Sequence, residues 1–496
     1  MAGRIFAAGK LAALLSLTAV ALALPEGPAN FERSDGAILS VCKNISSAIS
    51  SKSDVYYPLS FHYSADIAHW ASSSSANAAC SVEPGTVEDV GTILQILGST
   101  KTPFAVKGGG HSSNPGFSST AGVQIAMTRF SQINYDASSQ TVALGPGLIW
   151  DDVYAALEPH NVNVVGGRVT GVGVAGFTLG GGYSWKTSQY GLTIDTVQAF
   201  ELVLPNGTVT TVTAADEDLF FGLKGGFNNF GIVTQFTLKT FPQTQVWGGL
   251  ITITGDQLDK VTAAVAKFSA EVTDPKAAVL PTYNFVLGQT GVSLIMFYDA
   301  PTPPSGIFDD FLAIPSFTKD ISTRSFSSLV LSSPANATAG SRGLFHSVSV
   351  LNYTTSLLNV IVNESMYWGQ HLALDSASFI SYDVEPFLPS LFSHGAASAY
   401  PPDRSRGLLP LNLYFAWGSS LADGDMHQAI IQSADRIRAA AVAEGQDVAD
   451  AVVYGNYALY DASLQSIYGN NVDRLKSIKA TYDPTNVMGL AGGFRF

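Results

Sequence analysis

The pattern of apolar and polar residues changes near Phe241-Pro242 and divides the chain in two. In the first part, short apolar runs bounded by turn residues alternate with short amphipathic runs, the patterns of strands and helices. They predict helices at 87–97, 149–158 and 216–223, and strands at 104–106, 123–127, 141–144, 162–165, 199–204, 208–212 and 232–240. The order contains no β-α-β repeat, which favours a mixed α+β fold.

The second part has longer runs that are separated by longer connections. It predicts strands at 250–253, 283–287, 292–298, 379–383 and 411–417, and helices at 257–271 and 426–444. This order suits a second domain, an antiparallel sheet with helices on one face. The tail predicts a strand at 452–457 and a helix at 471–482, whereas 31–75 is Ser-rich and weakly patterned.

Residues 1–23 have the features of a secretory signal peptide. Arg4 and Lys10 form a basic end, 11–22 is a short apolar run, and Ala21-Leu22-Ala23 offers a small-x-small cleavage site. The apolar run is short for a membrane anchor. The chain is therefore expected to be secreted.

If the chain is secreted, its cysteines can form a disulfide and its Asn-x-Ser/Thr sequons can be glycosylated. Cys42 and Cys80 are the two cysteines of the chain, and an oxidising compartment favours one disulfide over two free thiols. The Asn-x-Ser/Thr sequons predict glycosylation at Asn44, Asn206, Asn336, Asn352 and Asn363. Asn206 lies in a predicted hairpin turn and should be exposed.

Length and charge limit the classes of function. A chain of 496 residues predicts two or three domains. The net charge of −13 argues against non-specific binding to nucleic acid or to anionic membranes. The histidines have no metal-ligand spacing, and the chain contains neither GxSxG nor HExxH. We therefore predict no metal centre and no hydrolase.

The most informative segment is Lys107-Gly108-Gly109-Gly110-His111, which follows a short apolar strand. Three consecutive glycines cost backbone entropy, so an ordinary turn does not need them. Their backbone N–H groups can surround an anionic group such as a pyrophosphate. The segment indicates a phosphate-bearing cofactor with an imidazole beside it, or else a surface turn with an incidental histidine.

A second glycine-rich segment lies at 171–182. Gly171-Val172-Gly173-Val174-Ala175-Gly176 matches the dinucleotide fingerprint GxGxxG by letter. That fingerprint should open a helix, but the glycines at 180–182 are unfavourable in one. The segment instead predicts extended backbone that passes close to a flat ligand.

With these motifs the chain resembles the berberine-bridge-enzyme-like flavin oxidases of the vanillyl-alcohol oxidase superfamily. The matching segments are 107–111, 171–182, 190–192, 218–226, 229–233, 454–457 and 482–487, and their order and spacing make the match specific. The resemblance implies a PCMH-type FAD-binding domain of two α+β subdomains at 72–243. A substrate domain at 244–445 and a C-terminal segment at 446–496 that returns to the flavin would follow.

The resemblance also implies roles for individual residues. Gly108–Ser112 would hold the FAD pyrophosphate, and His111 would form a covalent bond to the flavin 8α-methyl group. The flavin-binding residues that it implies are Lys107, Gly108, Gly109, Gly110, His111, Ser112, Gly116, Val169, Gly171, Gly173, Gly176, Gly181, Tyr183, Gly231, Ile232, Val233 and Asn456. Lys107 would be a phosphate-side or structural charge.

One position departs from the family pattern. Many members carry a second flavin link from a cysteine, and this chain has Val169 there. We therefore expect a single covalent link, through His111. Relatives that oxidise oligosaccharides commonly have both links, so the departure favours a smaller substrate, such as a phenol, alkaloid or polyketide-like metabolite.

The resemblance implies hydride transfer from the substrate to flavin N5 and reoxidation by molecular oxygen. Tyr454 and Tyr457 are the candidate catalytic residues, and a strand at 452–457 would direct both away from Asn456, which would contact the flavin. A tyrosine acts as a base only if its pKa is lowered from about 10. The alternatives are an oligosaccharide oxidase, a dehydrogenase that reacts poorly with oxygen, or a non-redox isomerase, cyclase or metabolite-binding protein. We expect a monomer.

Overall fold

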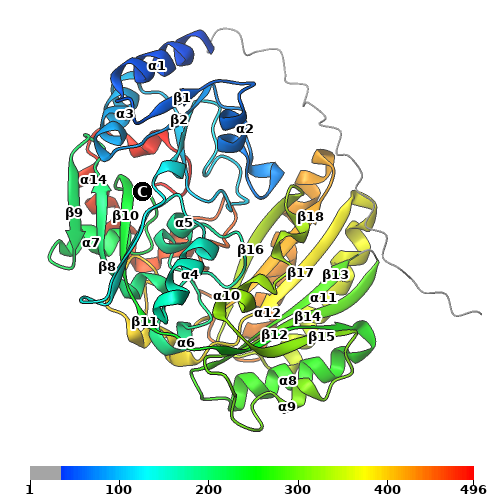
Figure 1. Cartoon of the computed structure of the whole chain (residues 1–496). Coiled ribbons are helices and arrows are strands. Elements are labelled where there is room, and N and C mark those ends of the chain that lie inside the picture. Colours follow the sequence, from blue (N-terminus) through cyan, green and yellow to red (C-terminus); the bar gives the residue numbers. More distant parts are fainter. Residues whose placement is uncertain (1–34, 287) are drawn as a thin grey trace, which may run out of the picture.

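The computed structural model describes residues 35–286 and 288–496, so the expected signal peptide lies outside the described residues. The described residues form three large sheets of four, five and seven strands and a two-stranded sheet. Figure 1 shows the four-stranded sheet at the top, the five-stranded sheet on the left and the seven-stranded sheet at the lower right. The mixed α+β fold expected from the pattern is confirmed.

The four-stranded sheet has the order β1-β2-β4-β3. Its strands are β1 (Asp54–Tyr56), β2 (Cys80–Glu83), β3 (Phe104–Lys107) and β4 (Val123–Ala126), and β3 runs parallel to β4. Helix α3 (Val87–Thr100) packs against it, and the Thr86 side chain caps the helix by accepting from the Asp89 backbone N–H. The predicted helix is therefore confirmed.

The five-stranded sheet has the order β5-β6-β10-β8-β9 and is antiparallel. Its strands are β5 (Ile133–Asp136), β6 (Thr141–Leu144), β8 (Val197–Val203), β9 (Val209–Thr213) and β10 (Ile232–Lys239). Helices α4 (Trp150–Leu157) and α7 (Glu217–Leu223) belong to the same part of the chain. Asn206 lies exposed in the β8–β9 turn, as predicted.

The seven-stranded sheet is antiparallel throughout and is the predicted second sheet. Its order is β15 (Thr318–Arg324), β12 (Val246–Thr254), β14 (Gln289–Tyr298), β13 (Ala277–Val286), β17 (Ala377–Val384), β18 (Leu409–Trp417) and β16 (Arg342–Val350). Helices α8 (Leu258–Glu271), α11 (Thr355–His371) and α12 (Asp423–Ala443) share one large apolar core with this sheet. The opposite face of the sheet borders the cavity described below.

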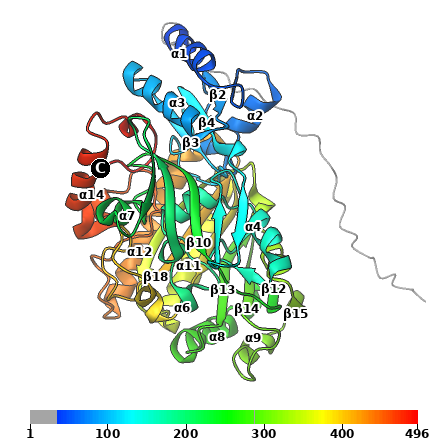
Figure 2. The same cartoon turned by 60° about the vertical axis from the view of Figure 1, so that its left-hand side comes forward.

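The C-terminal segment returns to the first half of the chain. Helix α14 (Val472–Tyr482) packs beside α7, as Figure 2 shows on the left of that view. The buried carboxylate of Asp483 accepts from the backbone N–H groups of Val487 and Met488 and from Nζ of Lys479. These bonds hold the chain that follows α14 in place. They also give hydrogen-bond partners to buried polar groups that would otherwise have none.

Three regions differ from the sequence-based predictions. The weakly patterned 31–75 region contains α1 (Asp35–Ala48) and α2 (Phe61–Ile67), of which α2 is capped by Ser60. The segment expected to be extended at 171–182 contains the short helix α5 (Val174–Leu179), because the run of three glycines at 180–182 begins only where α5 ends and the helix accommodates the single Gly176. Residues 452–457 form a turn rather than a strand.

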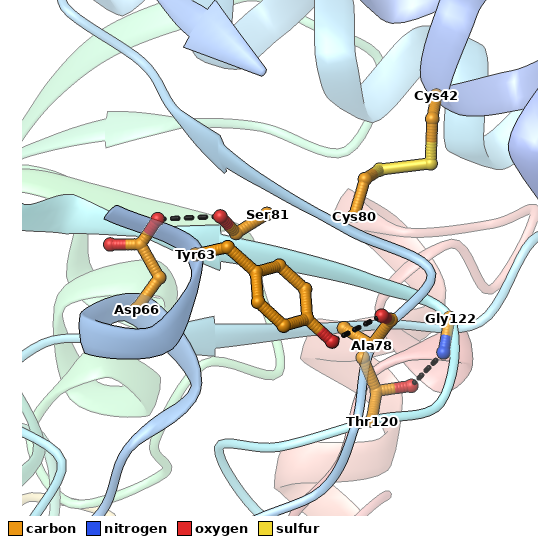
Figure 3. Close-up of a disulfide and its surroundings, with 8 residues drawn as sticks. All are labelled: Cys42, Tyr63, Asp66, Ala78, Cys80, Ser81, Thr120 and Gly122. Carbon is orange, nitrogen blue, oxygen red and sulfur yellow. Dashed lines mark hydrogen bonds between the residues drawn. A yellow bond between two sulfur atoms is a disulfide. The ribbon is translucent and has the colours of Figure 1, made fainter. Parts of the chain in front are cut away.

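The disulfide between Cys42 and Cys80 joins α1 to β2 across 38 positions of sequence, as predicted (Figure 3). Both sulfur-bearing residues are fully buried in the core under α3. Replacing both cysteines by alanine should therefore lower the free energy of unfolding of this part by about 4 kcal/mol, since the unfolded chain regains loop entropy. Urea denaturation with and without reductant measures this, and a reduced wild-type protein as stable as the oxidised one would contradict it.

Candidate flavin and substrate site

A cavity of about 730 Å³ lies between the two glycine-rich segments, the C-terminal turn and the uncovered face of the seven-stranded sheet. This volume is within the range of cofactor and small-molecule sites. The His111 loop, the α5 segment and the start of β10 line one end. Strands β13, β14, β16, β17 and β18 line the other end, so the cavity has two differently built halves.

The glycines of the His111 loop are required by close backbone contacts. A Cβ on Gly109 would lie 2.5 Å from the Cα of Gly173, and one on Gly108 would lie 2.7 Å from the carbonyl oxygen of Pro146. Within the described residues, the backbone N–H groups of 109–112 have no hydrogen-bond acceptor. The loop therefore offers unpaired donors at the cavity wall, as an anionic group requires.

His111 is held in a buried, uncharged state. Its imidazole stacks on the indole of Trp70 with ring centroids 4.5 Å apart, and burial lowers the pKa of His111 to about 4. Its Nε2 is buried and has no partner among the described residues. A neutral imidazole at the cavity wall fits the covalent flavin attachment that the resemblance implies, because only the neutral form has a free lone pair.

The structure separates the predicted flavin-binding residues into two groups. Those that line the cavity are Gly108, Gly109, Gly110, His111, Ser112, Val169, Gly173, Gly176, Tyr183, Ile232, Val233 and Asn456. Those that do not are Lys107, Gly116, Gly171, Gly181 and Gly231. Nζ of Lys107 donates to the carbonyl oxygen of Ala65, 2.7 Å away, so its charge serves the packing of α2.

Backbone geometry or close packing explains why glycine occupies the four predicted positions that do not line the cavity. Gly116 and Gly171 have positive φ angles of 76° and 85°, which favour glycine, and a Cβ on Gly231 would lie 2.3 Å from the Val203 carbonyl oxygen. Gly181 packs under the Tyr454 ring, which a Cβ would approach to 3.1 Å. These positions shape the walls of the site without reaching its interior.

Tyr457 belongs to a closed cluster with Arg168 and Glu385. Its hydroxyl donates to Oε1 of Glu385 at 3.0 Å and accepts from Nη2 of Arg168 at 2.9 Å. The same Nη2 lies 2.7 Å from Oε2 of Glu385, and the two charged side chains are 9% and 1% exposed. Burial raises the pKa of Glu385 to about 7, although the Arg168 cation opposes this rise.

Tyr454 has different surroundings. Its hydroxyl accepts from the backbone N–H of Gly182 at 2.9 Å and from Nδ2 of Asn456 at 2.7 Å, and burial raises its pKa to about 12. Tyr454 and Asn456 thus point the same way, and the prediction that they face apart is wrong. The reason is that 455–457 forms a turn, so strand alternation does not apply.

Several residues of the site were not found from the sequence. They are Trp70, Arg168, Phe345, Asp383, Glu385, Asn412 and Tyr414, all of which line the cavity. None belongs to a motif; the weak signal was alternation along 379–383 and 411–417, which brings every second residue to one face. Neither cysteine is a free thiol, so the chain has none for a second flavin link.

The described residues contain neither a cluster suited to a metal ion nor a helix suited to a membrane. Across 35–286 and 288–496, no group of three or more His, Cys, Asp or Glu residues could hold a metal ion. None of the helices in that part of the chain has the length and apolarity needed to cross a bilayer.

Comparisons with known proteins agree with the site. The model of an FAD binding domain matches residues 78–213, and the model called berberine and berberine like matches 453–491. The FAD-dependent monooxygenase macF of Penicillium terrestre is 31% identical over 441 residues, 84% of this chain and 81% of that protein. The FAD-dependent monooxygenase drtC of Aspergillus calidoustus is 36% identical over 304 residues, 59% of this chain and 58% of that relative's length.

Solved structures share the fold. The xylooligosaccharide oxidase of Myceliophthora thermophila aligns with a TM-score of 0.74 at 19% identity and covers 93% of this chain and all of its own. The FAD-binding domain, the cavity with its unpaired amides and neutral histidine, and the berberine-like C-terminal segment all occur in one chain. The chain belongs to the family of FAD-linked oxidoreductases with a berberine-like C-terminal segment.

Proposed function

We propose that the protein oxidises a small organic molecule that carries a hydroxyl group, with FAD held in the His111 half of the cavity and oxygen as the final acceptor. The observation that carries this proposal is the Tyr457–Glu385–Arg168 cluster, which lies in the same cavity as the His111 loop. It combines a hydroxyl, a carboxyl with a pKa near neutrality and a fixed cation, which suits removal of a proton from a substrate hydroxyl.

FAD, when bound, accepts a hydride from the substrate carbon and passes its electrons to oxygen. The protein residues handle the proton. Burial places the pKa of Tyr457 well above its usual value, so a free phenolate is disfavoured. We infer that Tyr457 accepts the substrate proton while it donates its own to Glu385, whose pKa of about 7 allows it to act as the base.

The residues proposed to hold FAD are the His111 loop, the 169–176 segment and Asn456. The amide groups of 109–112 would receive the pyrophosphate, and His111 would carry the one covalent link. Asn456 is fixed by its Nδ2 bonds to Tyr454 and to the carbonyl oxygen of Phe177. Tyr454 is then a support for this turn, and Tyr457 is the residue that meets the substrate.

Oxidation of a small ring compound is favoured over oxidation of an oligosaccharide, because apolar and aromatic side chains border the sheet end of the cavity. Phe345, Phe379 and Tyr414 lie there beside Leu280 and Ile295. The oligosaccharide oxidases among the structural neighbours share the fold at under 20% identity, and this similarity does not identify the substrate.

We also propose secretion, from the 1–23 pattern, and glycosylation at the five sequons, whose asparagines are all exposed.

The test is anaerobic mixing of the purified yellow protein with panels of aromatic alcohols, phenols and sugars, followed by admission of air. Bleaching of the flavin and release of one peroxide per substrate support an oxidase. Bleaching without peroxide supports a dehydrogenase. A flavin that no compound bleaches contradicts the redox proposal and favours the isomerase or binding alternative.

Replacing His111 by alanine should abolish covalent flavin attachment, because no thiol is present to form a second link. The expected result is complete loss of flavin fluorescence from the acid-precipitated protein, with the yellow colour moving to the supernatant. His69→Ala is the matched control, since the His69 ring is bonded to Ser118 and to the Ile67 carbonyl. Flavin that stays with the precipitated His111→Ala protein would contradict the assignment.

A further inference from the structure

One row of polar side chains crosses the cavity face of the seven-stranded sheet. Ser293 of β14 lies opposite Thr282 of β13, Thr282 lies opposite Asp383 of β17, and Asp383 lies opposite Asn412 of β18. Directly opposite residues of an antiparallel sheet point to the same face. All four residues line the cavity. The row is therefore a continuous polar strip on an otherwise largely apolar wall.

Asn412 is the member of this row with a buried side-chain oxygen that has no partner among the described residues. This oxygen is Oδ1, and the side chain is 5% exposed. Its Nδ2 donates to Oδ2 of Asp383 at 2.9 Å. A carboxylate can only accept, so this bond fixes the amide with its nitrogen toward Asp383 and its oxygen away from it.

Asp383 is itself held as an acceptor. Burial raises its pKa, but the side chains of Thr282, Asn412 and Ser381 act as donors that oppose the rise. Its Oδ2 thus has a protein donor in the Asn412 amide, whereas Oδ1 of Asn412 has no partner among the described residues. A ligand that satisfies this oxygen must bring an O–H or N–H group.

An aromatic wall borders the polar row. Phe345 lies opposite Tyr414 in the next pair of the sheet, with ring centroids 4.7 Å apart. Trp70 lies over both, 5.7 Å from Phe345 and 5.3 Å from Tyr414. Phe345 also approaches Tyr457 to 6.2 Å, so the wall extends from the His111 stack to the proposed catalytic hydroxyl. Such a surface favours the face of a flat ring.

The polar row and the catalytic cluster are close together. Asp383 and Glu385 are two residues apart at the end of β17, which places their Cα atoms about 7 Å apart. A single ring system with oxygen substituents at opposite ends can therefore contact Tyr457 and Asn412 together.

We propose that Asn412, oriented by Asp383, is the specificity residue of the site and accepts a hydrogen bond from a ring hydroxyl of a flat, uncharged substrate. This inference rests on the proposed function, since it names the substrate class of the same cavity. Asp383 is a positioning residue, because it acts through the amide of Asn412. A cationic amine is the competing ligand, which the Asp383 carboxylate would attract directly.

The experiment measures binding without turnover. The flavin-loaded protein is titrated with 2-naphthol, with its methyl ether and with 2-naphthylmethylammonium, and the flavin absorbance or the tryptophan fluorescence reports binding. The wild type should bind 2-naphthol about tenfold or more tightly than the ether, because the ether leaves Oδ1 unpaired. Asn412→Leu should bring the two affinities within about twofold of each other.

Three further variants make the outcome decisive. Asn284→Leu is the matched control: this buried asparagine of β13 bonds to Ser293 and does not line the cavity, so discrimination should persist. Asp383→Asn should weaken discrimination, because the amide of Asn412 loses its fixed orientation, and it replaces Asn412→Leu if that variant does not fold. Tyr457→Phe should keep the discrimination while losing turnover.

These arms separate the inference from the proposed function. Discrimination in binding without oxidation of any compound would reject the function and keep the inference. Discrimination that survives Asn412→Leu would overturn the inference, as would a wild type that binds neither naphthyl compound. Tightest binding of the cation would overturn it in favour of direct recognition by Asp383.

Discussion

Replacing Tyr457 by phenylalanine is expected to lower the rate of flavin reduction by a factor of about 10²–10⁴, the usual contribution of a positioned acid–base group. The variant keeps the ring that packs against Tyr454 and Phe345. It removes only the hydroxyl that donates to Glu385 and accepts from Arg168. Anaerobic stopped-flow measurement of flavin bleaching with a saturating substrate gives this rate directly.

Tyr454→Phe is the matched comparison for this variant. The hydroxyl of Tyr454 accepts from Gly182 and from Asn456, so its loss leaves the buried Gly182 N–H unpaired and removes one of the two bonds of the Asn456 amide nitrogen. We expect a cost in stability of about 1–3 kcal/mol, with flavin reduction far less affected than in Tyr457→Phe. The reverse order of the two rates would show that Tyr454 is the base and would reject the assignment of Tyr457.

The sequence predicted the elements where one local pattern decides the structure. The helix that Thr86 caps and the alternating strand β10 were correctly placed because their caps, turns and periodicity lie within a few residues. The β16 strand and the 17-residue helix α11 were missed. Strand β16 pairs with β18, which lies far from it in the sequence. A local pattern of apolar and polar residues contains no information about such a distant partner.

The glycine-rich segments illustrate a different limit. Their composition predicted close backbone approach, and Gly109 against Gly173 has that contact, but the neighbour is another loop of the protein. The glycine run at 180–182 similarly accommodates Asn456, which a Cβ on Gly180 would approach to 2.3 Å. A glycine-rich motif can predict that another group approaches the backbone closely. The tertiary fold decides which group that is.

The Tyr457–Glu385–Arg168 cluster was likewise predictable only in part. The motif 454–457 pointed to Tyr457, but its partners come from the loop before α5 and from the end of β17. Arg168 and Glu385 are joined by an ion pair of 2.7 Å although 217 positions separate them in the sequence. No spacing rule connects such residues, so the buried ion pair beside Tyr457 could not be predicted from the sequence.

Replacing Arg168 by leucine is expected to destabilise the protein by about 3–5 kcal/mol at pH 8.5, because the buried carboxyl of Glu385 loses the cation of its ion pair. The loss should be smaller at pH 5.5. With Arg168 absent, the pKa of Glu385 rises further above its unfolded value. Folded protein then binds more protons than unfolded protein between these two pKa values, so stability falls as pH rises through that window. Urea midpoints at the two pH values measure the effect.

The same variant should change the pH profile of flavin reduction, which a merely structural arginine would not do. In the wild type, the rate should rise with pH through about 7 as Glu385 loses its proton and becomes able to accept one. In Arg168→Leu this rise should move to higher pH, because the cation no longer favours the carboxylate. Arg404→Leu is the matched control: it breaks the ion pair with Asp195, which is 0% exposed, outside the cavity. It should lose stability and keep the wild-type profile, and an unshifted profile in Arg168→Leu would reject Glu385 as the proton acceptor.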